Sequence, residues 1–286
     1  MSTQYHTKFF ALNLTRRAEF GSTEVFAHAL SDAQVDLNPY QIEAALFAAR
    51  SPISKGALLA DEVGLGKTIE AALLLAQRWA ERRRKLLVIV PASLRKQWCS
   101  ELGEKFHLPT VVVERQTIDR ERAKENFNPF NHPGAVVVTS HPFAAKSGEF
   151  IRHIEWDMVV IDEAHRLRNV YKASNKNSNA IKRAVADRFK VLLTATPLQN
   201  SLLELYGLVS VIDDYYFGSL KGFKERYTGS RGSSEELKKR LSAICKRTLR
   251  KDVRQFVKFT ERKAVLQEFY PSPDEQRLYD LVSAWE

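Results

Sequence analysis

The chain has 286 residues, of which 44% are hydrophobic, and its 44 lysines and arginines exceed its 34 acidic residues by 10. This length and apolar content predict a globular protein with one large domain or two smaller ones. No apolar run reaches about 18 residues and no charged-then-apolar leader is present, so we expect neither a membrane span nor a secretory signal. Cys99 and Cys245 match no disulfide or metal spacing, which favours a reducing, cytoplasmic environment.

Short apolar runs of strand length alternate with helical stretches along most of the chain. Because the runs are continuous and rich in β-branched residues, they predict strands that are buried on both faces. The expected fold is therefore α/β, with a doubly wound, mainly parallel sheet between two layers of helices. The runs are residues 56–60, 86–90, 110–114, 135–140, 158–162 and 190–196.

A glycine-rich segment, DEVGLGKT (61–68), follows the first predicted strand and precedes a predicted helix. Gly64 and Gly66 permit a tight turn whose N–H groups converge on phosphate oxygens at the start of the helix. Lys67 can neutralise the β- and γ-phosphates, and the hydroxyl of Thr68 can bind Mg²⁺. Asp61 occupies the position of the usual first glycine, which weakens the match but removes no group that touches phosphate. An incidental glycine-rich turn is the alternative.

A second acidic motif, DEAH, follows the apolar run that ends at residue 162. Ligands in open α/β sheets bind outside the carboxyl ends of the strands, so this motif is expected beside the glycine-rich segment. Asp162 could hold Mg²⁺ through water, and Glu163 could polarise a water for attack on the γ-phosphate. Capping of the next helix is the alternative explanation for two adjacent acids.

Four more polar clusters lie beside predicted strands, and a basic segment lies near the end of the chain. The clusters are LNPYQ (37–41), PASLRKQW (91–98), VTSHPF (138–143) and TATPLQN (194–200). Residues 219–263 contain 15 basic and 5 acidic residues, so this segment alone has the net charge of the whole chain, +10. Such a segment is typical of binding to a polyanion such as nucleic acid, although charge alone is equally consistent with solvated helices.

Together, DEVGLGKT, DEAH, TATPLQN and Tyr40–Gln41 resemble the first RecA-like lobe of the Swi/Snf-type, superfamily-two helicase-like ATPases, which are double-stranded DNA translocases. An acid commonly stands at the first-glycine position in that family, so Asp61 agrees with the resemblance. The resemblance runs from about Leu37 to the end of the chain. It implies a RecA-like, P-loop lobe over residues 37–215 and a basic helical extension over 216–286, while the packing of residues 1–36 stays open.

The resemblance also implies ATP as substrate, Mg²⁺ as cofactor and a role for each motif. It assigns ATP binding to Gln41, which would read the adenine, and to Asp61, Gly64, Leu65, Gly66, Lys67 and Thr68. Catalysis falls to Lys67, Asp162 and Glu163, with Thr68 and Asp162 as ligands of Mg²⁺. Thr194, Ala195 and Thr196 would couple the nucleotide state to the DNA-tracking surface. Ser93, Lys96, Thr139 and Ser140 would lie near the DNA backbone, while Trp98 is more typical of a core residue.

Two details point to a narrower group within that family. Val63 stands where eukaryotic remodellers commonly have methionine, and TATP replaces TGTP. Both choices resemble the bacterial branch that includes the RNA-polymerase-associated recycling ATPase. Residues 202–227 and 244–253 resemble the helical extension that Swi/Snf-type enzymes add to this lobe, which gives the basic segment a place in the fold.

Members of this family hydrolyse ATP between two lobes, and the second lobe supplies arginines to the γ-phosphate. We find no Q-x-x-G-R-x-x-R stretch, and the chain ends inside a predicted amphipathic helix with Leu278, Leu281, Val282 and Trp285 on one face. We therefore expect a fragment that lacks the second lobe and that hydrolyses ATP poorly alone.

Two hypotheses from different classes follow. In the first, the chain is the ATP-binding half of a DNA-dependent ATPase that translocates on duplex DNA, without sequence preference, and remodels DNA-bound protein complexes. In the second, it is a free-standing nucleotide-dependent binding module without turnover. A DEAH-type RNA helicase fits TATPLQN and the extension poorly. Transcription recycling, DNA repair and defence against phage would all use such an engine, so the biological process stays open.

Overall fold

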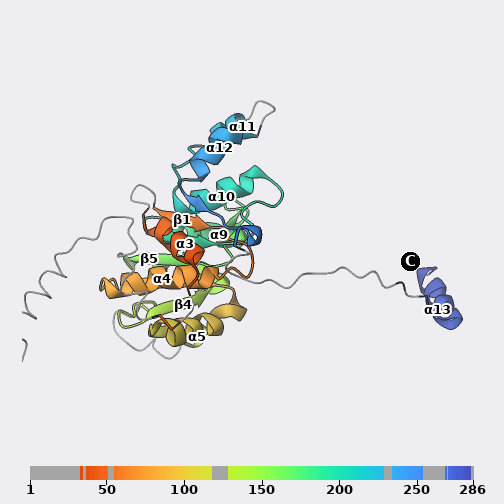
Figure 1. Ribbon diagram of the computed structural model, residues 1–286, viewed down its shortest axis with the longest axis horizontal. Helices are drawn as coiled ribbons and strands as arrows, with labels where there is room; N and C mark the ends of the chain where they lie inside the picture. Colours follow the sequence, from red (N-terminus) through yellow and green to blue (C-terminus); the bar gives the residue numbers. More distant parts are fainter. Residues whose placement is uncertain are drawn as a thin grey trace, which may run out of the picture. The chain divides into compact units, whose positions relative to one another are not determined.

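All six predicted apolar runs form strands, and they pair in one sheet of this computed structural model (Figure 1). The order across the sheet is β3-β4-β2-β5-β6-β1-β7, and every pair of neighbours is parallel. The predicted doubly wound, parallel α/β fold is confirmed. The strands are β1 (Gly56–Leu59), β2 (Leu86–Val90), β3 (Thr110–Val112), β4 (Val136–Ser140), β5 (Met158–Ile161), β6 (Lys190–Leu193) and β7 (Cys245–Lys246).

The structure describes residues 33–34, 37–50, 55–117, 128–228, 234–253, 268 and 270–284. The chain divides into two compact units, the first ending at Val253 and the second starting at Arg254. The predicted N-terminal segment, 1–36, lies almost entirely outside the described residues, as does the part of the basic segment from 254 to 263.

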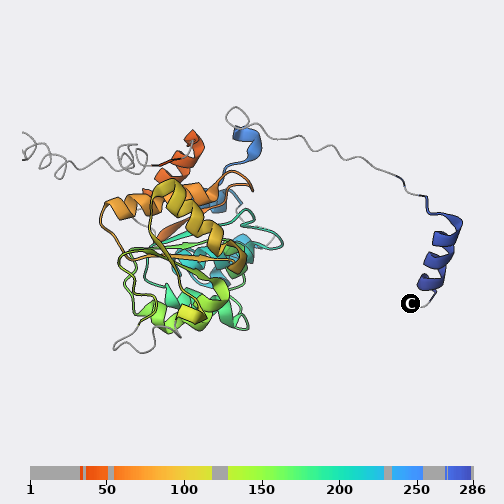
Figure 2. The same cartoon turned by 90° about the horizontal axis from the view of Figure 1, so that it is seen from below.

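Helices cover both faces of the sheet because both faces of every central strand are apolar. Leu87 and Ile89 of β2 belong to one buried cluster, while Leu86, Val88 and Val90 belong to the other. The second cluster is covered by α3 (Pro39–Ala49), α4 (Lys67–Ala80) and α5 (Arg95–Phe106). The first is covered by α7 (His141–Lys146), α8 (Gly148–Arg152), α9 (Lys176–Ala184) and α10 (Leu202–Ile212). Figure 2 shows the two helical layers, orange and yellow on one side and green on the other.

The helical extension is part of the first unit. After α10, the helices α11 (Leu220–Tyr227) and α12 (Ser234–Leu241) pack around a ring cluster of Phe217, Phe223 and Tyr227, whose centroids lie 5.1–6.2 Å apart. The chain then returns to the sheet as β7, where Leu58 N–H donates to the Ile244 carbonyl at 2.8 Å. The first compact unit thus includes β7, which pairs with β1, and the boundary between lobe and extension at residue 215 stays a prediction.

The second unit contains the helix predicted near the end of the chain. α13 (Pro273–Ser283) begins with a capping box formed by Ser272 and Glu275, and Leu278, Leu281 and Val282 are exposed within this unit. Trp285 lies outside the described residues. Among the helices that the structure describes, none is long and apolar enough to cross a membrane.

A fully buried lysine starts β6. The ammonium of Lys190 donates to the carbonyls of Val185 and Ala186, at 3.2 and 2.6 Å, just after α9. Burial lowers the pKa of this lysine to about 8, and the nearby positive charge of Lys55 acts in the same direction. The folded protein therefore favours the neutral amine more than the unfolded chain does.

This shift predicts a pH dependence of stability. From about pH 8 to pH 10 the unfolded chain binds more protons at Lys190 than the folded protein, so the free energy of unfolding rises with pH. Urea denaturation should show wild type gaining about 2 kcal/mol relative to Lys190→Met between pH 7 and pH 10. Lys221→Met, at an exposed lysine, is the control and should follow wild type. Parallel profiles for wild type and Lys190→Met would contradict the assignment.

Candidate nucleotide site at the carboxyl edge of the sheet

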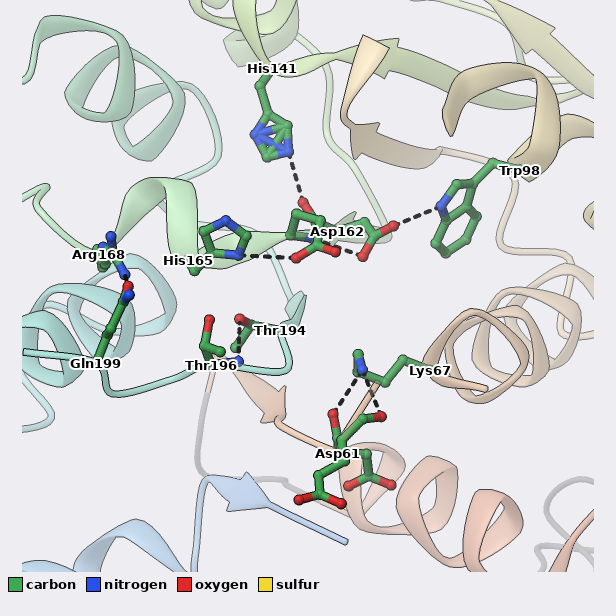
Figure 3. Close-up of polar contacts among 12 residues, drawn as sticks. Asp61, Lys67, Trp98, His141, Asp162, His165, Arg168, Thr194, Thr196 and Gln199 are labelled. Atoms are coloured by element: carbon green, nitrogen blue, oxygen red, sulfur yellow. Dashed lines mark hydrogen bonds and ion pairs between the residues drawn. The ribbon is translucent and has the colours of Figure 1, made fainter. Parts of the chain in front are cut away.

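Parallel pairing brings the predicted motifs to one edge of the sheet. Asp162 follows β5, Thr194 follows β6 and Asp61 follows β1, and these three strands are neighbours. Thr194 N–H donates to the Leu59 carbonyl at 3.1 Å, which joins two of the loops directly. Figure 3 shows Lys67, Thr194 and Asp162 together at this edge of the sheet, as the strand order requires.

The turn before α4 has the backbone that the glycines predict. Gly64 and Gly66 have φ of 82° and 84°, in the left-handed region, and Gly66 is the N-terminal cap of α4. A Cβ at Gly66 would lie 2.3 Å from Nε2 of Gln41, so both the conformation and the contact require glycine here. The helix N-terminus is therefore free of side chains where a phosphate would approach.

Lys67 lies over the loop with its ammonium held by backbone oxygens. Nζ donates to the carbonyls of Asp61 and Glu62, at 2.7 and 3.1 Å. Burial lowers the pKa of Lys67, while the carboxylates of Glu70, Asp61, Glu163 and Asp162 act in the opposite direction. The cation thus lies within electrostatic reach of both acidic motifs.

Gln41 packs beneath the same loop. Its Oε1 accepts from Asn38 N–H and its Nε2 donates to the Leu65 carbonyl, both at 3.0 Å. One N–H and one acceptor position of the amide remain for a ligand such as adenine. The Leu65 side chain is buried, so this residue can take part in nucleotide binding only through its backbone.

Asp61 has a different role from the one its place in the motif suggests. Its side chain is fully buried, and Oδ1 accepts from Thr248 N–H at 2.6 Å. The carboxylate therefore cannot touch a nucleotide, which corrects the prediction of a direct ATP contact. It ties the phosphate loop to the segment after β7, and the Arg250 side chain reinforces this by donating to the Val63 carbonyl at 2.7 and 3.0 Å.

Glu70 lies beside Asp61 in the interior. Asp61 Oδ2 and both Glu70 oxygens are buried without any other hydrogen-bond partner. Burial, followed by the charge of Asp61, raises the pKa of Glu70 well above its usual value. Burial also raises the pKa of Asp61, so both acids of the pair favour the protonated form more than they would in water.

The acidic motif after β5 is held rigidly. Asp162 Oδ1 accepts from Glu163 N–H at 2.8 Å, and Oδ2 accepts from the Trp98 indole at 2.9 Å. Glu163 has φ of 48°, a left-handed conformation that is uncommon for a residue with a side chain. Its Oε2 lies 3.0 Å from Nδ1 of His165, at ion-pair distance but without hydrogen-bond geometry. Such backbone conformations in non-glycine residues cluster at functional sites.

Trp98 and His141 are neighbours of the site that the sequence analysis did not assign to it. Trp98 is buried, as predicted, but its indole reaches Asp162. His141 Nε2 lies 2.7 Å from the Asp162 carbonyl oxygen. Both residues stand in the polar clusters after β2 and β4, which is the signal that could have drawn attention to them.

The segment after β6 forms a second braced loop. Thr194 is buried and its Oγ1 accepts from Thr196 N–H at 3.2 Å, whereas Thr196 is exposed and Ala195 is half-buried. Glu204 of α10 accepts from the N–H groups of Gln199 and Asn200, at 3.1 and 3.2 Å, and lies 3.7 Å from Arg168. These contacts connect the predicted coupling segment to η3 (Ala164–Leu167), which follows the DE pair.

The four predicted DNA-backbone residues separate into two pairs. Ser93 of η2 (Ala92–Leu94) and Lys96 of α5 are exposed. Thr139 is fully buried and donates to the Val113 carbonyl at 2.9 Å, and Ser140 is buried and caps α7 by accepting from Phe143 N–H. The prediction that Thr139 contacts DNA is therefore corrected, because its hydroxyl faces the interior. Ser140 is 7% exposed and offers little surface to a partner.

The oxygen ligands of the site suit Mg²⁺. A carboxylate from Asp162 and a hydroxyl from Thr68 are hard ligands, and Mg²⁺ usually completes its shell with waters and substrate phosphates. Within the described residues no three His, Cys, Asp or Glu side chains form a metal-binding group. A site that combines few protein ligands with a phosphate loop fits magnesium bound together with a nucleotide.

Comparison with known proteins agrees with this arrangement. The sequence matches the SNF2-related domain over residues 40–284. The ATP-dependent helicase YqhH of Bacillus subtilis is 36% identical over 251 residues, 86% of this chain and 42% of that protein. Protein CHROMATIN REMODELING 4 of Arabidopsis thaliana is 33% identical over 218 residues, 71% of this chain and 10% of that protein. This chain spans less than half the length of either relative.

Two solved structures share the fold. The SWI2/SNF2 ATPase core of Sulfolobus solfataricus in complex with double-stranded DNA superposes with a TM-score of 0.63 at 26% identity, over 76% of this chain and 45% of that one. The same core domain in a second structure gives a TM-score of 0.61 at 24% identity, over 76% and 44% of the two chains. The second comparison shows the fold alone.

The bond from Thr248 to Asp61 predicts a stability effect. Asp61→Ala removes the acceptor of a buried N–H, so we expect the free energy of unfolding to fall by about 2 kcal/mol in guanidinium denaturation. Asp61→Asn keeps an oxygen acceptor for Thr248 and gives Glu70 a donor, so its loss should be clearly smaller. Equal losses in the two variants would contradict the role given to this carboxylate.

Proposed function

This chain belongs to the SNF2-related family, and from that premise we propose that it is the ATP-binding lobe of an ATPase that moves along duplex DNA and remodels protein complexes bound there. The observation that carries the proposal is the position of Lys67, after β1, at the same edge of the sheet as the Asp162–Glu163 pair after β5, with only β6 between the two strands and the charges within electrostatic reach of each other. Two relatives, named as an ATP-dependent helicase and a chromatin-remodelling protein, support the same class of activity.

ATP binding is proposed at the N-terminus of α4. Gly66 caps α4 without a side-chain hydrogen bond, so the first N–H groups of this helix can donate to phosphate oxygens. Lys67 has to exchange the Asp61 and Glu62 carbonyls for phosphate oxygens, which form stronger, charge-assisted bonds. Gln41, which is proposed to read the adenine, is 5% exposed and bonded to the Leu65 carbonyl, so its amide would have to turn toward the ligand.

Hydrolysis is proposed at Glu163. Its half-buried carboxylate can orient a water and accept its proton during attack on the γ-phosphate. Asp162 and Thr68 would hold the magnesium ion, which when bound neutralises charge on the phosphates.

Efficient turnover is proposed to need a second lobe. In the family that the motifs resemble, that lobe supplies arginines to the γ-phosphate, a contact worth roughly 10³–10⁵ in rate in other phosphoryl-transfer enzymes. The match covers only 42% of YqhH and 45% of the archaeal core bound to DNA, which leaves room in those proteins for such a lobe. We infer that the 286-residue chain alone hydrolyses ATP barely above background.

Duplex DNA is the proposed track. Ser93 and Lys96 are exposed at the start of α5, where a hydroxyl and an ammonium can bind backbone phosphates without reading bases. The solved archaeal core with DNA is a structural neighbour, which supports this choice of partner. The basic segment adds long-range attraction for any polyanion.

The nucleotide assignment predicts opposite results for two variants. Lys67→Ala removes the phosphate cation and should weaken ATP binding by more than about 100-fold in calorimetry. Glu163→Gln keeps the shape of the side chain and one acceptor oxygen but cannot take up a proton, so ATP affinity should change by less than about threefold, since the proposed role of Glu163 is in hydrolysis. Unchanged affinity in Lys67→Ala would exclude this loop as the phosphate site.

Turnover is measured on the same preparations by phosphate release. We expect little hydrolysis from the wild-type chain, with or without duplex DNA, because these 286 residues contain no Q-x-x-G-R-x-x-R stretch that could supply arginines to the γ-phosphate. Robust turnover that duplex DNA stimulates and Glu163→Gln abolishes would show instead that this chain is a complete motor.

DNA binding should be weak, independent of sequence and strongly dependent on salt. Fluorescence anisotropy with scrambled duplexes across a salt series should show that Lys96→Ala lowers affinity equally for every sequence and reduces the salt slope by about 1. Lys105→Ala is the matched control, because Lys105 is on the same helix, near its C-terminal end, and pairs with Glu101. Preference for one sequence, or equal effects of the two variants, would contradict the proposed track.

A further inference from the structure

Asp162 is held at three atoms by three groups. Its Oδ2 accepts from the Trp98 indole at 2.9 Å, its Oδ1 accepts from Glu163 N–H at 2.8 Å, and its carbonyl oxygen lies 2.7 Å from Nε2 of His141 (Figure 3). The bond to Glu163 is local. The other two bonds connect Asp162 to residues 64 and 21 positions away.

We propose that Trp98 and His141 are positioning residues for Asp162, which set the orientation of its carboxylate and the place of its backbone and thereby the affinity of the site for Mg²⁺. This inference rests on the proposed function, in which Asp162 is a ligand of the ion. Partners that hold a metal ligand from behind commonly change metal affinity by about 10–100-fold when they are removed.

Trp98 is suited to this task by its chemistry and its packing. The indole N–H can only donate, so it can bind the ionised carboxylate but cannot exchange roles with it. The ring is 1% exposed and packs in the core beneath α5, so it cannot follow a carboxylate that rotates. With one lone pair of Oδ2 and one of Oδ1 engaged, the remaining lone pairs of Asp162 point in fixed directions.

His141 holds the backbone of the same residue. A carbonyl oxygen can only accept, so the Nε2 that faces it carries the proton and Nδ1 does not. The ring is 6% exposed, so it is held in place beside the carbonyl by the packing around it.

Both residues stand on rigid elements beside the strand that carries Asp162. Trp98 lies in α5, after β2, which pairs directly with β5. His141 starts α7, immediately after β4, which pairs with the far side of β2. Asp162 N–H itself donates to the Ile89 carbonyl of β2 at 2.9 Å. The position of the carboxylate thus depends on three neighbouring strands rather than on one loop.

The chain offers a matched pair of tryptophans for the test. Trp98→Phe removes the indole donor at the site, while Trp156→Phe removes an equally buried indole that donates to the Ile151 carbonyl at 2.9 Å. ATP affinity of the 286-residue chain is measured by calorimetry over a range of Mg²⁺ concentrations. The quantity compared is the half-saturating Mg²⁺ concentration, at which half of the Mg²⁺-dependent increase in ATP affinity is reached. We expect it to rise about tenfold in Trp98→Phe and to stay at the wild-type value in Trp156→Phe.

The outcomes separate this inference from the proposed function. If the wild-type chain shows no ATP binding that Mg²⁺ strengthens, the proposed function fails and the inference fails with it. If wild type binds and both tryptophan variants keep its Mg²⁺ dependence, the inference alone is overturned. An equal rise in both variants also overturns it, because it would indicate a general loss of stability.

Histidine variants test the second half of the pair. His141→Phe keeps a ring of similar size without a donor, and its control is His153→Phe, whose Nδ1 lies 2.6 Å from the Glu149 carbonyl. We expect a rise of about threefold to tenfold in the half-saturating Mg²⁺ concentration for His141→Phe alone, smaller than for Trp98 because the backbone is also held by β2. No difference between the two variants would remove His141 from the proposal.

A measurement without substitution at Trp98 covers the case in which Trp98→Phe does not fold. Trp79, Trp156 and Trp285 are each replaced by phenylalanine, and the indole N–H resonance that persists in all three ¹⁵N spectra belongs to Trp98. In the ATP-bound chain this resonance should shift when Mg²⁺ is added, because its acceptor carboxylate gains the ion. An unchanged resonance under saturating Mg²⁺ would overturn the inference.

Discussion

The whole site depends on the parallel pairing of strands that are buried on both faces. Parallel neighbours need long crossovers that cover the sheet, and they place every loop that follows a strand at the same edge. β5, β6 and β1 are adjacent in the sheet, although β1 starts at Gly56 and β6 starts at Lys190. The phosphate loop, the DE pair and the TATP segment therefore meet without any long-range sequence signal of their own.

Buried carboxylates join these loops to the rest of the lobe. A carboxylate without partners is costly in the interior, and three of the buried acids here accept from backbone or side-chain donors, whereas Glu70 lies beside Asp61 without such a donor. Asp61 binds the backbone after β7, Asp162 binds an indole from α5, and Glu204 binds the loop after β6. The acids of this edge thus act as cross-links as well as functional groups, which explains why two of them, Asp61 and Glu204, have almost no exposed surface.

Burial also explains why the sequence motif placed Thr139 near the DNA backbone, whereas the structure places it in the interior. Thr139 stands in a polar cluster, TSH, at the end of β4, and a polar cluster after a strand predicts an exposed loop. In the structure the strand continues through Ser140, and the threonine hydroxyl satisfies the Val113 carbonyl at the end of the neighbouring strand. Which of several consecutive polar residues faces outward depends on the register of pairing, and the pattern of residue types does not determine that register.

The sequence alone determined six of the seven strands that the structure describes, the class of fold and the turn before α4, because these depend on local properties. Continuous β-branched runs favour buried strands, and Gly64 and Gly66 adopt the left-handed conformations that the turn needs. Only the tertiary structure decided that Asp61 faces Thr248, that Trp98 reaches Asp162 and that Arg250 meets the phosphate loop. The partners in these contacts lie 64 to 187 residues apart, and they meet because of strand order and helix packing, which no local pattern contains.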